Sequence, residues 1–66
     1  MIGNVKWWNA AKGFGFITSE DGRDVFVHHS GIIGRQRPKN LQDGQRVQFT
    51  QEDTERGPRA INVVSL

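Results

Sequence analysis

The chain has 66 residues, no cysteine and a formal net charge of +2, from nine lysines and arginines against seven acids. A chain of this length forms one small domain with little core, and without cysteine it has no disulfide or thiolate zinc site to stabilise it. No apolar run approaches the roughly 18 residues of a membrane span, and no signal-peptide core follows Met1. We therefore expect a single soluble, cytoplasmic domain over residues 1–66, without a cofactor.

Short segments of alternating apolar and polar residues predict five strands, near 2–9, 14–19, 24–29, 46–52 and 59–65. Glycine-containing turns separate most of them, and the longest connection covers residues 30–45, where 30–33 fits one helical or 3₁₀ turn. No stretch has a sustained helical period. The fold class is therefore all-β, and five short strands fit a small closed barrel, whose closure removes the sheet edges.

The second and third predicted strands each have an aliphatic and an aromatic side. Because side chains alternate along a strand, Phe14 and Phe16 share one face, and Phe26 and His28 share one face in the same way. The aliphatic residues are left for the barrel interior. The predicted core is Ile17, Val25, Val27, Val47, Phe49, Ile61 and Val63.

The aromatic stripe has two interpretations. In a small domain such a stripe more often belongs to a core covered by another layer. No amphipathic helix is present in the sequence to cover it, however, and Lys6 and Lys12 are interleaved with it. Gly13 and Gly15 flank Phe14, which leaves room for a flat group to approach the backbone. We therefore interpret the stripe as an exposed surface on which unpaired bases stack.

Charges are segregated along the sequence. Residues 1–17 contain two lysines and no acid, and residues 35–39 contain two arginines and a lysine and no acid. The acids gather near 20–24 and 52–55, where we interpret them as ordinary solvated turns. Basic segments that flank an aromatic sheet indicate contacts with phosphates.

Two short motifs give the chain a family resemblance. Residues 12–17 (Lys-Gly-Phe-Gly-Phe-Ile) resemble the RNP1 signature, and residues 25–28 (Val-Phe-Val-His) resemble its shorter companion, RNP2. They follow a Lys-Trp segment at 5–9 and precede Arg-Gly-Pro at 56–58. With these motifs the chain resembles the bacterial cold-shock proteins over essentially all 66 residues.

The resemblance implies a five-stranded antiparallel barrel of the OB type that binds single-stranded RNA and DNA, typically pyrimidine-rich. It also implies action as an RNA chaperone and as a regulator of transcription and translation. Position by position, it assigns base stacking to Trp7, Phe14, Phe16, Phe26 and His28, and contacts with phosphates or base edges to Lys6, Lys12 and Arg56. Trp7 reaches this face only if the first strand bulges, because strict alternation places it beside Val5.

Three positions in the expected interface depart from the family pattern. Trp8 stands where phenylalanine is usual, and so does His29. The loop 35–40 carries Arg35, Arg37 and Pro38 where a further stacking aromatic is usual, and it is one residue longer than in the family. One base subsite is therefore expected to be weaker, or to be replaced by guanidinium stacking and phosphate contact.

The main alternative of another class is an SH3-like barrel that binds Pro-rich peptides, since such barrels also expose aromatic side chains. The absence of tyrosine and the basic surroundings of the stripe disfavour it. We expect a monomer, with strand exchange through residues 30–45 as the route to a dimer.

Metal binding and catalysis are not expected. His28 and His29 are neighbours that would point to opposite faces of a strand, and no third ligand stands at a suitable spacing. The sequence lacks a P-loop, a dinucleotide fingerprint and a pattern typical of a catalytic acid and base.

Overall fold

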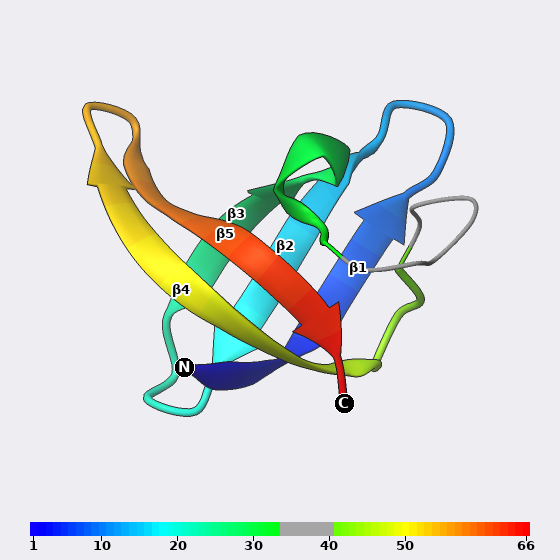
Figure 1. The fold of residues 1–66 in the computed structure, drawn as a ribbon, viewed down its shortest axis with the longest axis horizontal. Coiled ribbons are helices and arrows are strands. Elements are labelled where there is room, and N and C mark those ends of the chain that lie inside the picture. Colours follow the sequence, from blue (N-terminus) through cyan, green and yellow to red (C-terminus); the bar gives the residue numbers. More distant parts are fainter. Residues whose placement is uncertain (34–40) are drawn as a thin grey trace.

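The computed structural model describes residues 1–33 and 41–66, and in them five strands form a closed barrel (Figure 1). The strands are β1 (Ile2–Asn9), β2 (Phe14–Ser19), β3 (Asp24–His28), β4 (Arg46–Thr54) and β5 (Gly57–Ser65), with a 3₁₀ turn η1 (His29–Gly31) after β3. All five predicted strands are confirmed. The third ends one residue earlier than predicted, and the last two extend toward each other until only residues 55–56 separate them.

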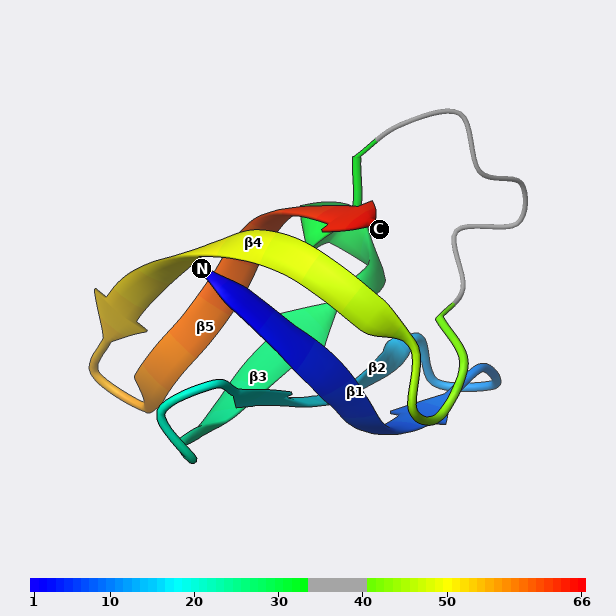
Figure 2. The ribbon, with the colours of Figure 1, turned by 90° about the horizontal axis from the view of Figure 1, so that it is seen from below.

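The strands follow one another around the barrel in the order β1-β2-β3-β5-β4, and β4 pairs with β1 to close the ring (Figures 1 and 2). Four of the neighbouring pairs are antiparallel, whereas β3 and β5 run parallel. The predicted fold class, an all-β five-stranded barrel of the OB type, is confirmed, with one parallel pair among its antiparallel ones. An odd number of strands cannot alternate in direction all the way around a closed ring, so one pair must run the same way.

The barrel interior is aliphatic, with Phe49 as its aromatic member. The buried hydrophobic residues are Val5, Ile17, Val25, Val27, Ile32, Leu41, Val47, Phe49, Ala60 and Val63. Six of the seven predicted core residues are confirmed. Ile61 is half-buried instead, because β5 bulges next to Asn62, whose φ of 53° interrupts the alternation and lets Val63 point inward.

Across the ranges that the structure describes, no helix has the length and apolar character needed to cross a membrane.

Candidate nucleic-acid interface

Four aromatic rings form a continuous cluster on the outside of β1, β2 and β3, which we call the aromatic platform: Trp7, Phe14, Phe16 and Phe26. The Trp7 ring centroid lies 5.7 Å from that of Phe14 and 5.5 Å from that of Phe16. Phe26 completes the circle at 5.9 Å from Phe14 and 5.8 Å from Phe16. Trp7 is 36% exposed and the phenylalanines are half-buried. Each ring thus supports its neighbours by tilted or edge-on contact and stays accessible to a ligand.

A bulge in β1 brings Trp7 onto this face. Val5 pairs with Ile17, but Trp7 pairs with Phe16, so Lys6 is an extra residue in β1. The bulge that Trp7 needs in order to reach the face of the phenylalanines is therefore confirmed. Trp8, in contrast, lies opposite Gly15 and packs against the hydrophobic core, so the structure separates it from the platform.

The two histidines lie where β3 ends. His28 pairs with Phe14 across β2 and β3, and its Nδ1 accepts a hydrogen bond from the Ser30 N–H at 3.2 Å. The ring of His29 lies 4.2 Å from that of His28. The expectation that these rings point to opposite faces was wrong, because His29 begins η1 and strand alternation no longer applies to it. In the described part of the chain, no group of three His, Cys, Asp or Glu residues could hold a metal ion.

Gly13 and Gly15 make room for the chain itself. A Cβ atom on Gly13, which has a φ of +74°, would lie 2.5 Å from Cδ2 of His29. A Cβ atom on Gly15 would lie 2.2 Å from the carbonyl oxygen of Trp7. The interpretation that these glycines leave space for a ligand was therefore wrong. They allow the close packing that holds His29 and the bulged part of β1 in place.

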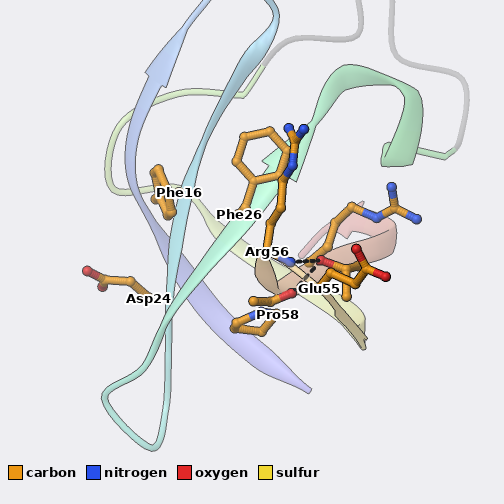
Figure 3. A pocket seen from close by; sticks show the side chains of 9 residues that line it. Phe16, Asp24, Phe26, Glu55, Arg56 and Pro58 are labelled. Carbon is orange, nitrogen blue, oxygen red and sulfur yellow. Dashed lines mark hydrogen bonds between the residues drawn. The ribbon is translucent and has the colours of Figure 1, made fainter.

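A hollow lies beside the platform, between the rings of Phe16 and Phe26 and the turn that joins β4 to β5 (Figure 3). Arg56 and Pro58 line it from the turn. Two hydrogen bonds hold this turn: the Thr54 hydroxyl donates to the carbonyl of Gly57 at 2.8 Å and accepts from the N–H of Arg56 at 3.2 Å. The Arg56 side chain therefore lines the hollow together with the two rings.

The other predicted cations differ in their surroundings. Lys6 donates to Asp24 at 3.0 Å, in an ion pair of two half-exposed side chains. Lys12 is exposed on the turn that leads into Phe14, and its N–H donates to the side chain of Asn9. Arg37 lies outside the described residues.

Acidic side chains also lie at this site. Asp24 and Glu55 line the hollow with Phe26, and Glu52 pairs with Arg59 at 2.7 Å. These side chains are solvated, as expected, but they also border the platform, which the sequence did not predict. The parallel pairing of β3 with β5 brings the β4–β5 hairpin beside Phe26, and no local pattern in the sequence signals that approach. Sequence reasoning missed six residues of the hollow: Asp24, Thr54, Glu55, Gly57, Pro58 and Arg59. Asp24 is the one that a local pattern could have found, because alternation along β3 places it on the face of Phe26.

Comparison with known proteins gives the family. Residues 1–66 match the family described as the "Cold-shock" DNA-binding domain. The chain is 58% identical over 66 residues to the cold shock-like protein CspC of Bacillus cereus, with 100% of both chains covered. It is 58% identical over 62 residues to cold shock protein 1 of Lactiplantibacillus plantarum, covering 94% of this chain and 92% of that one. The cold shock-like protein CspE of Bacillus anthracis is 56% identical over 66 residues, covering 100% of this chain and 97% of that one. With the closed five-stranded barrel, these matches favour the OB-type fold over the SH3-like alternative, and the chain belongs to the cold-shock domain family.

Proposed function

We propose that this chain binds single-stranded RNA and DNA by stacking unpaired bases on the aromatic platform. The observation that carries the proposal is the circle of four mutually supporting rings on the outer face of β1–β3. Stacking a base on an aromatic side chain contributes about 1–3 kcal/mol and depends little on base identity, because every base has a flat π face. Two or three such contacts account for useful affinity without a sequence code.

Cations at the edge of the platform supply the second part of the binding energy. Arg56 stands beside Phe16 and Phe26, and we assign it, with Lys6 and Lys12, to phosphates or base edges. Each phosphate contact to a single strand should add about −0.7 to the slope of log K against log salt. Arg37 and the two histidines are assigned to the same interface, and a preference for pyrimidines follows from the family resemblance.

Such binding would let the chain act as an RNA chaperone without a nucleoside triphosphate. A protein that binds only the open form of a hairpin shifts the equilibrium toward that form by its differential affinity. Weak secondary structure in RNA would then melt in proportion to the protein concentration, which in turn influences transcription and translation.

The intrinsic fluorescence of the two tryptophans tests the proposal, because Trp7 lies on the platform and Trp8 packs against the core. We expect oligo(dT) to quench the wild type and the Trp8→Phe variant, and to leave the residual signal of Trp7→Phe almost unchanged. Oligo(dA) should bind more weakly, and a duplex and a PxxP peptide should cause no saturable change. Equal binding of duplex and single strand, or saturation by the peptide alone, would refute the proposed function.

A further inference from the structure

One residue from each strand lies in a single row around the outside of the barrel. Pairing across the strands joins Trp7 to Phe16, Phe16 to Phe26, Phe26 to Arg59, and Arg59 to Glu52. Directly paired residues of neighbouring strands project from the same face of a sheet. The row of rings on β1, β2 and β3 therefore continues on β5 and β4 as an arginine and a glutamate.

Arg59 is placed to meet a ligand that covers Phe26. It lines the hollow shared with Phe16 and Phe26, and also a second hollow along β5 that it shares with His28 and Asn62. Neighbouring strands lie about 4.8 Å apart, so the long side chain of Arg59 reaches the space directly beside the Phe26 ring. The planar guanidinium fork matches two oxygens of a phosphate.

Glu52 holds that guanidinium in an ion pair. The Arg59 Nη2 atom lies 2.7 Å from the Glu52 Oε2 atom, and the two side chains are 46% and 44% exposed. An ion pair this exposed contributes little net free energy, about 0–1 kcal/mol. A phosphate can therefore take the place of the carboxylate without destabilising the barrel.

We propose that Arg59 binds a backbone phosphate of the strand whose bases stack on the platform, and that Glu52 competes with this phosphate for the guanidinium. The inference rests on the proposed function and adds to it a phosphate contact on β5 and an internal competitor. The competition has one distinctive consequence, which is that loss of an acidic side chain increases the affinity. Removing Glu52 should tighten binding, and it should do so only while Arg59 is present.

A double-mutant cycle of Glu52→Gln and Arg59→Gln, measured by fluorescence anisotropy with labelled oligo(dT) at several salt concentrations, tests this. We expect Glu52→Gln to lower Kd severalfold and Arg59→Gln to raise it severalfold, with the salt slope reduced in magnitude by about 0.7 in Arg59→Gln. The double variant should bind like Arg59→Gln alone. Arg59→Lys should keep the salt slope near that of the wild type and still bind more weakly, because it keeps the charge and loses the fork.

The chain offers a matched control in a second ion pair. Glu20 lies 3.8 Å from Arg46, and neither lines the two hollows. Glu20→Gln makes the same change in net charge as Glu52→Gln and should leave Kd nearly unchanged. Thermal unfolding of every variant should stay close to that of the wild type, since both pairs are exposed.

The possible failures are distinguishable. If Glu52→Gln tightens binding equally with and without Arg59, Glu52 acts as a simple repelling charge and the competition is refuted. If Arg59→Gln changes neither Kd nor the salt slope while Phe26→Leu weakens binding, the phosphate contact alone is refuted. If Phe26→Leu also binds like the wild type, the proposed platform fails first.

Discussion

Substitutions of two phenylalanines, one outside the barrel and one inside it, test whether binding and stability depend on different residues. Phe26 is half-buried and contacts Phe14 and Phe16, whereas Phe49 is 3% exposed in the core. Phe26→Leu keeps an apolar side chain of similar bulk and removes the ring on which a base stacks. The loss of about 1–3 kcal/mol of stacking corresponds to a rise in Kd of about 5- to 150-fold.

The same change should destabilise the fold no more than a comparable change in the core does. Phe26→Leu loses its two ring contacts, which we estimate at about 1 kcal/mol for partly exposed side chains. Phe49→Leu leaves unfilled space in a close-packed interior, at a cost of about 1–2 kcal/mol. In a domain of this size, that cost lowers the unfolding temperature by roughly 4–16 °C.

The assay pairs oligo(dT) anisotropy at low temperature, where both variants are folded, with thermal unfolding of the same samples by circular dichroism. We expect Phe26→Leu to bind weakly although it unfolds no earlier than Phe49→Leu, and Phe49→Leu to bind normally although it loses at least as much stability. Equal loss of affinity in the two variants would show that binding follows general loosening of the barrel. Normal binding by a folded Phe26→Leu would refute base stacking at this ring.

Three further predictions concern single positions. Gly15→Ala should destabilise the protein by about 1–3 kcal/mol and weaken oligonucleotide binding, because the new Cβ would lie 2.2 Å from the carbonyl oxygen of Trp7; an unchanged urea midpoint would contradict this. Lys12→Gln should reduce the salt slope of oligo(dT) binding by about 0.7, and a slope equal to that of the wild type would remove Lys12 from the phosphate contacts. The Ser19 hydroxyl donates to Asp21 and holds the pKa of that carboxyl below its usual 3.8. Asp21 therefore contributes stability that is present above its unfolded-state pKa and lost as pH falls through the lower folded value. Ser19→Ala should raise the Asp21 pKa toward 3.8 in an NMR titration, and an unmoved pKa would disprove the role of the hydrogen bond.

Local alternation in the sequence was enough to predict which side chains of β2 and β3 point into the barrel. Alternation along β2 and β3 separated Ile17, Val25 and Val27 from the aromatic residues, and the structure confirms that division. Alternation also identified Trp7 as the exception that required a bulge, because its position conflicted with that of Val5. These features depend on neighbours in the chain, which the sequence displays directly.

Features that depend on distant pairings were beyond the reach of local patterns. The bulge beside Asn62 that turned Ile61 outward arises where β5 must fit the register of β4. The closeness of the His28 and His29 rings has another cause: β3 ends at His28 and η1 begins at His29, a boundary that the sequence predicted one residue too late. Apart from Asp24, the charged residues that share the hollow with Phe26 come from the β4–β5 hairpin, which the parallel pair brings beside it.

The parallel pair also places charged side chains at the end of the aromatic row, in a chain whose net charge is only +2. Five strands around a ring require one parallel pair, and here it joins the end of the aromatic row to Arg59 and, beyond it, Glu52. The four platform rings do not enter the core, whose buried aromatic residue is Phe49 and against which Trp8 packs. Each ring is instead partly buried against its neighbours and partly exposed, so part of the hydrophobic free energy is retained. The buried part of the Phe26 side chain contributes to stability, and the exposed ring is available to a base. Phe26→Leu should therefore weaken oligonucleotide binding and leave the barrel folded.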